Sequence, residues 1–342
     1  MTLTYTDLGW SDFFQSQQDS DDGELTRFRV SAVHRDRLTG LSPDGEIPVL
    51  PDRLTGEFAV GDWILVNEAS QVCKRLERQT ELSRRAAGTD ARVQLIAANV
   101  DVLFITTSCN EDFNLARLER YLALAHQAGC VPVVVLTKAD VCEDAAEYRA
   151  KAQSLSPSLT VLTLDAKDPD DLKQLLSLVS PGQTAALVGS SGVGKTTLTN
   201  GLTGSTDAVR EVREVDSKGR HTTTARYLRR MVHGGWLIDT PGMRALRIKD
   251  ADEAVEEVFY DLTEVAQGCR FSDCAHSGEP GCAVRAAVKA GTVERDRFER
   301  WQKLHRDEER NTENLAQSRR RDKGLGKMIK SMKRDHKGRK GY

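Results

Sequence analysis

Short apolar stretches, each bounded by turn residues, follow one another along the chain after residue 26. Four of them have the length and pattern of β-strands: residues 27–34, 46–50, 62–66 and 70–76. The segment Ser42-Pro43-Asp44-Gly45 and the pair Gly61-Asp62 supply turns between them. Several short strands within about fifty residues predict a small β-barrel, such as an OB-fold or an SH3-like barrel. The pattern alone leaves open whether this barrel binds an oligonucleotide or is purely structural.

A different pattern begins near residue 100. Residues 100–107 and 131–137 are continuous apolar runs, which are typical of parallel strands buried on both faces. Residues 115–127, between them, repeat apolar side chains at helical spacing. Further strands are expected at residues 161–164, 184–188 and 236–238. Together these elements predict a doubly wound α/β nucleotide-binding domain.

The remaining segments indicate how the chain divides. Residues 77–94 are polar with basic pairs and are interpreted as a linker, and residues 293–318 have a helical pattern. An apolar cluster near Trp10 predicts a short helix that packs on the barrel. The predicted limits are 1–88 for the N-terminal segment and barrel, 89–250 for the nucleotide-binding domain, and 251–342 for a C-terminal domain with a basic tail.

The composition predicts a soluble protein with packed hydrophobic cores, since 39% of the 342 residues are hydrophobic and 29% are charged. The longest apolar run, near residues 131–136, is too short to span a membrane, and the N-terminus lacks the features of a signal peptide. Seven cysteines, three of them within 269–282, favour reduced thiols and a metal site over disulfides. A cytoplasmic protein without membrane contact is therefore expected.

Charge is distributed unevenly along the chain. Residues 319–342 carry eleven Lys/Arg against two Asp, which is +9, so that the net charge of −2 leaves −11 for the preceding residues. A solvated, disordered end is the simplest interpretation of such a tail. A basic tail on an otherwise acidic protein is also typical of nucleic-acid binding, which we favour.

The clearest motif is a phosphate-binding loop of the form G-x-x-x-x-G-K-[ST], between an expected strand and an expected helix. Its glycines allow backbone N–H groups to point at phosphate oxygens, and the helix N-terminus adds partial positive charge. Lys195 is expected to reach the β- and γ-phosphates and to serve catalysis, and the Thr196 hydroxyl to bind Mg²⁺. The residues assigned to the nucleotide in this stretch are Gly189, Ser190, Ser191, Gly192, Val193, Gly194, Lys195, Thr196 and Thr197.

A second motif ends the strand 131–137. In Thr137-Lys138-Ala139-Asp140, of the form [NT]-K-x-D, the Asp140 carboxylate can accept hydrogen bonds from guanine N1–H and N2–H₂. Adenine lacks this donor pair and would leave the carboxylate unpaired. Four residues recur by chance, but the carboxyl end of a parallel strand is where open α/β sheets bind ligands. Thr137, Lys138, Ala139 and Asp140 are therefore assigned to guanine binding.

Two further segments complete the expected nucleotide site. Ile238-Asp239-Thr240-Pro241-Gly242 follows a short apolar strand, so that Asp239 is expected to hold Mg²⁺ and the Gly242 N–H to meet the γ-phosphate. Alone, this segment could be an ordinary Asp-initiated turn. The polar loop 219–224 contains three threonines, of which Thr223 is assigned as a second hydroxyl ligand to Mg²⁺.

Near the C-terminus, Cys269, Cys274, His276 and Cys282 form a C-x₄-C-x-H-x₅-C pattern. Three thiolates and one imidazole can close a tetrahedral Zn²⁺ site with no open position, so one structural Zn²⁺ is favoured over free thiols. The other four cysteines lie in or beside strand-like segments and are interpreted as core packing: Cys73, Cys109, Cys130 and Cys142.

The order of these motifs is permuted, because the base-reading motif precedes the phosphate loop, whereas in ordinary small GTPases it comes last. With its TKAD, GSSGVGKTT, GRHTTT and DTPGMR motifs and its cysteine cluster in this order, the chain resembles the circularly permuted GTPases of small-ribosomal-subunit biogenesis, the RsgA/YjeQ family. The resemblance covers about residues 27–304. It implies an N-terminal OB-fold, a permuted P-loop GTPase domain and a C-terminal zinc domain.

The resemblance also implies an activity and partners. It implies GTP hydrolysis to GDP and phosphate, stimulated by the 30S subunit, late in the maturation of that particle and in contact with 16S rRNA. Two positions depart from the family pattern: Thr137 stands where many members carry Asn, and Asp165-Ala166-Lys167 stands where similar proteins carry Ser-Ala. The Ala166 N–H is still assigned to guanine O6.

Hydrolysis requires a positioned water. Ras-like enzymes place a Gln after D-x-x-G, but Met243 occupies that position here, so slow intrinsic turnover that a partner raises is expected. His221 is assigned as the group that orients the water, and a loop histidine that contacts rRNA or solvent is the equal alternative.

Two other classes of function compete with a GTPase. A P-loop small-molecule kinase gives no reason for the T-K-x-D motif, the cysteine cluster or the basic tail. A nucleic-acid-binding module with a vestigial nucleotide site is opposed by intact Lys195, Thr196 and Asp239. Nothing in the sequence indicates a self-complementary surface, so a monomer is expected.

Overall fold

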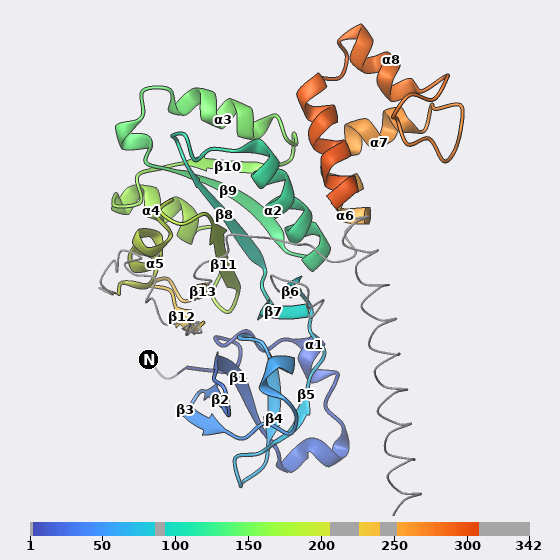
Figure 1. The fold of residues 1–342 in the computed structure, drawn as a ribbon. Helices are drawn as coiled ribbons and strands as arrows, with labels where there is room; N and C mark the ends of the chain where they lie inside the picture. The colour runs from blue at the N-terminus through green and yellow to red at the C-terminus, as the bar shows by residue number, and fades with distance from the viewer. Residues whose placement is uncertain (1–2, 86–92, 206–225, 240–251, 308–342) are drawn as a thin grey trace, which may run out of the picture. The chain divides into compact units, whose positions relative to one another are not determined.

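A computed structural model describes residues 3–85, 93–205, 226–239 and 252–307 (Figure 1). The described residues fall into two compact units. The first is drawn from residues 1–83 and 94–246, and the second from 84–93 and 247–342. Among the described residues, no helix combines the length and the apolar character that crossing a membrane requires.

The N-terminal part of the first unit is a small barrel. Its strands are β1 (Thr26–Val33), β2 (Leu38–Ser42), β3 (Gly45–Val49), β4 (Trp63–Val66) and β5 (Val72–Arg75), which pair in the order β3-β2-β1-β4-β5. Leu50 then bridges to the edge of β5, because its N–H donates to the Ser70 carbonyl at 2.8 Å and its carbonyl accepts from Val72 at 2.9 Å. The bridge brings β3 beside β5, so that the five strands follow one another around a barrel. Its core contains Phe28, Val30, Leu38, Val49, Phe58, Ile64, Val66 and Val72.

The N-terminal segment packs on this barrel as predicted. It contains α1 (Asp12–Gln15) and the 3₁₀ turn η1 (Ser20–Glu24), and a second 3₁₀ turn, η2 (Thr55–Glu57), lies in the barrel. Trp10 meets Trp63 of β4 edge to face, with ring centroids 4.8 Å apart. The segment thereby covers large apolar surface of the barrel.

A buried arginine joins the barrel to the following sheet. The Arg29 guanidinium of β1 donates to the Leu8 carbonyl at 2.7 Å, to the Thr184 hydroxyl at 2.6 Å and to the Asn99 carbonyl at 3.3 Å. Burial lowers the pKa of Arg29 to about 10, which still leaves it charged at neutral pH. Its two terminal nitrogens donate to three oxygens from separate parts of the first unit, while its Nε is buried without a partner.

The central sheet has six strands in the order β10-β9-β8-β11-β13-β12. The strands β8 (Val102–Ser108), β9 (Val131–Thr137), β10 (Thr160–Thr163), β11 (Thr184–Gly189) and β13 (Trp236–Asp239) are parallel, and β12 (Leu228–Arg230) is antiparallel to β13. Their near-continuous apolar runs are explained because helices cover both faces.

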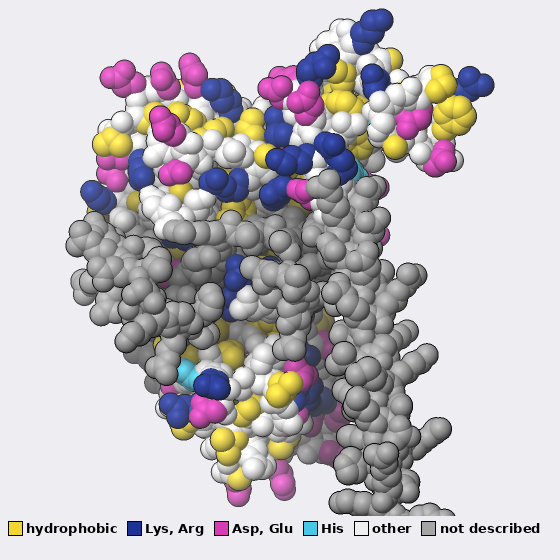
Figure 2. Space-filling view, in the orientation of Figure 1, with side chains coloured by type: hydrophobic (Ala, Val, Ile, Leu, Met, Phe, Trp, Pro, Cys, Tyr) yellow, Lys and Arg dark blue, Asp and Glu magenta, His cyan; other side chains and the backbone are white. Residues whose placement is uncertain are grey.

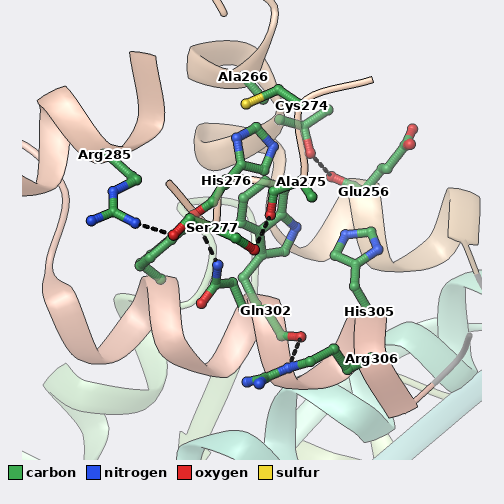
Figure 3. A pocket seen from close by; sticks show the side chains of 13 residues that line it. Glu256, Ala266, Cys274, Ala275, His276, Ser277, Arg285, Gln302, His305 and Arg306 are labelled. Carbon is green, nitrogen blue, oxygen red and sulfur yellow. Dashed lines mark hydrogen bonds between the residues drawn. The ribbon is translucent and has the colours of Figure 1, made fainter. Parts of the chain in front are cut away.

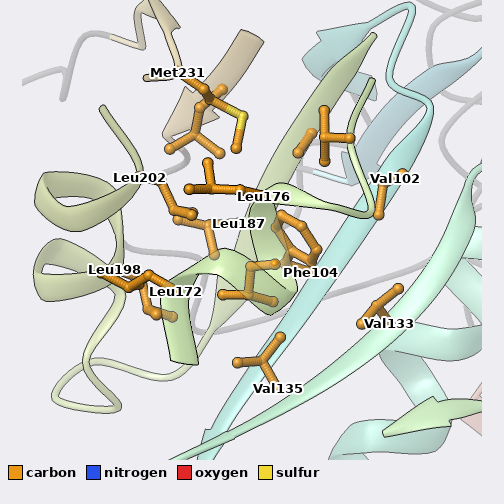
Figure 4. Close-up of a cluster of buried hydrophobic side chains, with 14 of the residues drawn as sticks. Val102, Phe104, Val133, Val135, Leu172, Leu176, Leu187, Leu198, Leu202 and Met231 are labelled. Atoms are coloured by element: carbon orange, nitrogen blue, oxygen red, sulfur yellow. The ribbon is translucent and has the colours of Figure 1, made fainter. Parts of the chain in front are cut away.

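On one face lie α2 (Leu115–Ala128) and α3 (Ala145–Gln153), and on the other α4 (Pro169–Leu176) and α5 (Lys195–Thr203) (Figure 1). Figure 4 shows Leu172 and Leu176 of α4 and Leu198 and Leu202 of α5 directed at the strand side chains, with Phe104 of β8 among them. This core fixes the ends of the strands from which the candidate site is built.

Residues 252–307 of the second unit are mainly helical. It contains α6 (Asp252–Val258), α7 (Tyr260–Ala266), α8 (Ala283–Ala290) and a helix over 295–307. Among its buried residues are Phe259, Leu262, Val284 and Trp301. The predicted helical pattern at 293–318 is thus observed as far as residue 307.

Three sequence expectations differ from the structure. The strand β2 was not expected, since its LTGLS sequence is short and contains Gly40; that glycine lies where an added Cβ would come within 3.0 Å of Phe28. The interpretation of residues 77–94 as a linker is wrong for residues 81–85 and 93–94. These residues belong to β6 (Glu81–Arg85) and β7 (Val93–Ala98), which form a two-stranded sheet whose Leu82 is fully buried.

The third concerns the four cysteines interpreted as core packing. The interpretation holds for the burial of Cys109 and Cys130, but it is wrong for Cys73, which is exposed.

Candidate functional site

The loops that carry the nucleotide motifs leave the same edge of the central sheet. The strands β8, β9, β10, β11 and β13 are parallel and adjacent, so their carboxyl ends lie together. In this register Ser108 lies opposite Thr137, Thr106 opposite Gly189, and Leu187 opposite Asp239. Segments that are separate in sequence are therefore brought to one edge, which is where open α/β sheets bind ligands.

The phosphate loop begins where β11 ends. Gly189 has φ of +146°, and a Cβ at this position would lie 2.1 Å from the Thr106 carbonyl oxygen of β8, so only glycine fits. The Lys195 ammonium at the start of α5 donates to the Gly189 carbonyl at 2.9 Å and also to the Ser190 carbonyl. The ammonium therefore lies over the concave side of the loop, where a phosphate chain would be held.

Thr137 joins the base-reading motif to the phosphate loop. Its side chain is 1% exposed, and its hydroxyl lies 2.7 Å from the Val193 carbonyl and 3.2 Å from the Thr107 carbonyl, in position to donate to either. The hydroxyl is thus directed at the phosphate loop and at β8. Residues 137 and 193 are 56 positions apart, and this contact places their two motifs side by side.

The rest of the base-reading motif forms a sharp turn. Lys138 has a left-handed conformation with φ of +60°, which is uncommon for a residue with a side chain. The 3₁₀ turn η3 (Ala139–Val141) follows, and the Asp140 side chain is exposed. An exposed carboxylate at this edge is available to a ligand.

The loop assigned to guanine O6 follows β10, the strand next to β9. Leu164 donates its N–H to the Leu136 carbonyl at 2.9 Å, which brings the loop after β10 next to the end of β9. Ala166 is 8% exposed and belongs to the hydrophobic core, while the Asp165 carboxylate accepts from the Lys167 N–H at 2.9 Å. This turn is shaped by Asp165, a feature the Ser-Ala comparison did not indicate.

Asp239 is the last residue of β13 and is partly exposed, and Thr196 is exposed in the first turn of α5. These are the described residues to which Mg²⁺ was assigned, and both lie at the same edge as Lys195. The other predicted members of the nucleotide site lie outside the described residues: His221, Thr223 and Gly242, together with Met243.

Arg117 was missed by the sequence reasoning. It lies in the first turn of α2, and its guanidinium donates to the Ser190 hydroxyl of the phosphate loop and to the Asp112 carbonyl at 3.3 Å. Arginines are common on amphipathic helices, so no sequence signal marked this one as part of the site. Arg117 reaches Ser190 because α2 follows β8, the phosphate loop follows β11, and these two strands are neighbours in the sheet.

The predicted zinc ligands are brought together in the second unit. The ligand atoms of Cys269, Cys274, His276 and Cys282 all lie within 4.8 Å of one another. His276 Nδ1 is 3.6 Å from Cys269 Sγ and 3.4 Å from Cys282 Sγ. Tetrahedral Zn²⁺ with bonds of about 2.3 Å to sulfur and 2.0 Å to nitrogen requires S···N separations of about 3.5 Å. The four side chains therefore fit one Zn²⁺.

Backbone groups and neighbouring side chains orient these ligands. The Ala283 N–H points at Cys269 Sγ at 3.3 Å, and the Gln302 amide donates to the His276 carbonyl at 3.1 Å. Figure 3 shows Cys274 and His276 on the wall of a pocket that Gln302 and His305 also line. Such surrounding contacts fix ligand orientation in structural metal sites.

Glu279 shapes the loop between two of the ligands. Its carboxylate accepts from the N–H groups of Ala275, Ser277 and Gly278, at 3.1, 2.8 and 2.9 Å. Hydrogen bonds from these backbone N–H groups lower the pKa of Glu279 to about 2. No sequence signal pointed to this residue.

Comparison with known proteins agrees with this geometry. The family described as RsgA GTPase matches residues 75–249. A small ribosomal subunit biogenesis GTPase RsgA of Mesorhizobium japonicum is 51% identical over 313 residues, covering 90% of both chains. An RsgA 2 of Vibrio parahaemolyticus is 44% identical over 334 residues, covering 97% of this chain and 93% of its own.

Two solved structures resemble the fold. The crystal structure of YjeQ from Thermotoga maritima has a TM-score of 0.59 and 24% identity, over 85% of this chain and 99% of its own. The structure of YloQ, a circularly permuted GTPase, has a TM-score of 0.57 and 22% identity, over 88% of this chain and 98% of its own.

A phosphate loop at the end of β11, with T-K-x-D on the earlier strand β9, defines a P-loop GTPase whose motifs are circularly permuted. The chain belongs to the RsgA family of small ribosomal subunit biogenesis GTPases. The predicted family, fold class and GTPase activity are thereby confirmed.

Proposed function

We propose that this chain hydrolyses GTP to GDP and phosphate on the 30S ribosomal subunit late in its maturation, with turnover stimulated by the subunit. The observation that carries the proposal is the contact of the Thr137 hydroxyl with the Val193 carbonyl at 2.7 Å. This contact sets the guanine-reading motif against the phosphate loop, so that one nucleotide can meet both.

The principal residues of the site have proposed tasks. Backbone N–H groups of the loop 189–194 bind phosphate oxygens, Lys195 neutralises charge on the β- and γ-phosphates, and Asp140 accepts from guanine N1–H and N2–H₂. The Thr196 hydroxyl and Asp239 hold Mg²⁺, with Thr223 as a further ligand. Mg²⁺, when bound, offsets the negative charge of the phosphates.

The proposed assignments extend to segments outside the described residues. His221 orients the attacking water and Gly242 meets the γ-phosphate. Because Met243 replaces the glutamine of Ras-like enzymes, intrinsic turnover is slow and the subunit completes the site. The Ala166 N–H serves guanine O6, and Thr137 supports the phosphate loop.

The barrel is the proposed contact with 16S rRNA. Its β1–β2 turn contains His34, Arg35 and Arg37, of which both arginines are exposed, and Figure 2 shows a histidine with Lys/Arg side chains on the barrel. The loop between the first two strands is one that OB-folds use to bind oligonucleotides. By contrast, acidic side chains gather over α3 (Figure 2), where Glu143, Asp144 and Glu147 are exposed and would repel phosphates.

The remaining parts complete the proposal. Residues 1–88, 89–250 and 251–342 are the proposed domains, Zn²⁺ is structural, and the tail after residue 319 binds rRNA phosphates. The protein acts as a cytoplasmic monomer.

Nucleotide turnover with GTP and with ATP, each with and without purified 30S subunits, tests the proposal. We expect the protein to hydrolyse GTP but not ATP, and the subunit to raise the rate of GTP hydrolysis on the order of tenfold or more. Lys195→Ala is expected to abolish it. Preference for ATP, or GTP turnover that the subunit leaves unchanged, would contradict the proposal.

Asp140→Asn tests the base-reading motif separately. An amide cannot accept both guanine donors, so we expect GTP affinity to fall about a hundredfold and affinity for xanthosine triphosphate to rise. Asp144→Asn, an exposed carboxylate nearby, is the matched control and should leave both affinities unchanged. Equal behaviour of the two variants would refute the assignment of Asp140.

A further inference from the structure

One side chain of α2 contacts the phosphate loop, and the tasks proposed above give it no role. The Arg117 guanidinium donates to the Ser190 hydroxyl and to the Asp112 carbonyl, the latter at 3.3 Å. The backbone N–H of Arg117 donates to the side chain of Asn114, which caps the helix, at 2.9 Å. Arg117 is therefore fixed at its backbone by the cap and at its guanidinium by two oxygens.

The residue that Arg117 contacts is held by two cations. The Ser190 hydroxyl accepts from Arg117, and the Ser190 carbonyl accepts from the Lys195 ammonium. Lys195 is the residue proposed to reach the β- and γ-phosphates, so its ammonium changes partners when a nucleotide binds. Arg117 bonds to the hydroxyl instead and can keep this contact with the loop empty or filled.

We propose that Arg117 is a positioning residue for nucleotide binding. Through the Ser190 hydroxyl it holds the start of the phosphate loop in the shape that accepts the phosphates of GDP and GTP. The inference rests on the proposed binding of phosphates by this loop, and it extends the site to a residue of α2.

The physical reason is preorganisation. The N–H groups of a phosphate loop bind well only when they point inward together, and ordering a loose loop upon binding costs affinity. A hydrogen bond with a charged donor restrains the loop more strongly than a neutral one. Arg117 is exposed and Ser190 partly exposed, so water screens the contact. We therefore expect its loss to weaken nucleotide binding about threefold to tenfold.

Positioning and direct contact with the phosphates predict different kinetics. A correctly shaped loop holds the same phosphates in the ground state and in the transition state. Its loss therefore raises KM and leaves kcat within about twofold. A guanidinium that itself stabilised the charge of the transition state would lower kcat instead.

A double-mutant cycle in the full-length, zinc-loaded protein tests the inference. The Kd of a fluorescent GDP analogue is measured for the parent, for Arg117→Ala, for Ser190→Ala and for the double variant, and intrinsic kcat and KM for GTP are measured for the parent and Arg117→Ala. We expect each single variant to bind about threefold to tenfold more weakly, and the double variant to lose no more than either single one. Alanine is a good helix former and retains the backbone N–H that the cap accepts, so α2 should be preserved.

Arg149→Ala is the matched control. Arg149 is an exposed arginine of α3, and its variant removes the same charge from the same face of the sheet, so it should bind as the parent does. Unchanged affinity in Arg117→Ala, additive losses in the double variant, a fall in kcat without a rise in KM, or equal loss in the control would each overturn the inference. A parent protein that does not bind the GDP analogue would instead refute the proposed function, and the inference with it.

Discussion

The central sheet and the region of the cysteine–histidine cluster differ in what holds them together. One face of the sheet buries a cluster of sixteen apolar residues contributed by strands, by α4 and α5, and by the loops beside them. The described residues of the second unit form four helices and a long loop that carries the cysteines. Only ten of these described residues are buried and hydrophobic. The loop between α7 and α8 instead converges on three sulfurs and one imidazole.

This difference has a thermodynamic meaning. A sheet buried on both faces gains most of its stability from apolar area removed from water, at about 25 cal/mol per Å². A small helical region gains less from that source and depends on an added constraint such as a metal. We therefore expect the two regions to respond to different perturbations, and each prediction below separates them.

Zinc removal is expected to have the largest effect. Binding of structural Zn²⁺ contributes about 10 kcal/mol or more to folding of small zinc domains. Replacing Cys282 by Ser should therefore remove the amide protection of α7 and α8 in hydrogen exchange, while nucleotide binding at the sheet persists. Cys73→Ser is the control, since this thiol is exposed and outside the cluster. Undiminished protection of α7 and α8 in the Cys282 variant would show that apolar packing alone supports this region.

Phe104→Ala should produce the complementary result. Phe104 is fully buried in the sheet core, and truncating such a ring costs about 3–5 kcal/mol. Urea unfolding followed by circular dichroism should show this loss in the first unit, while zinc content stays at one per chain. Val141→Ala, at a side chain that is 77% exposed, should change the free energy of unfolding by less than about 0.5 kcal/mol. Loss of zinc on replacing Phe104 would mean that the two regions are not independent.

Thr137→Val should have the smallest effect on stability, and its main consequence should be weaker nucleotide binding. The substitution keeps the shape of a buried side chain but removes the donor to the Val193 carbonyl, at a cost of about 1–3 kcal/mol. We expect weaker binding of GDP, measured by titration calorimetry, with zinc content unchanged. Thr160→Val, at an exposed position of β10, is the matched control. If the two variants bind GDP equally well, the hydroxyl does not position the phosphate loop.

Sequence patterns predicted most of this architecture because its chemistry is local. The phosphate loop, the T-K-x-D motif and the cysteine cluster each place their functional groups within a few residues, so spacing alone reveals them. The parallel strands were recognisable because burial on both faces leaves uninterrupted apolar runs. The strand β2 was missed because Gly40, which gives room to the Phe28 ring, weakens the strand pattern.

The residues that escaped prediction act across long separations or through the backbone. Arg117 reaches Ser190 across 73 positions, and only the strand order brings them together. Glu279 shapes its loop by accepting hydrogen bonds from three backbone N–H groups, and a sequence does not show such contacts. The assignment of Thr137 to guanine binding stays a prediction, while the contacts of its hydroxyl with carbonyls of the phosphate loop and of β8 were not foreseen.

Arg29 has a mechanical consequence. Its guanidinium ends on Thr184, the first residue of the strand whose last residue opens the phosphate loop. Separating the barrel from the sheet would break the hydrogen bonds of the Arg29 guanidinium to Thr184 and to Asn99, each worth about 1.5–3 kcal/mol because the donor is charged. The barrel thus anchors β11 at its first residue, and the phosphate loop begins at the last residue of the same strand.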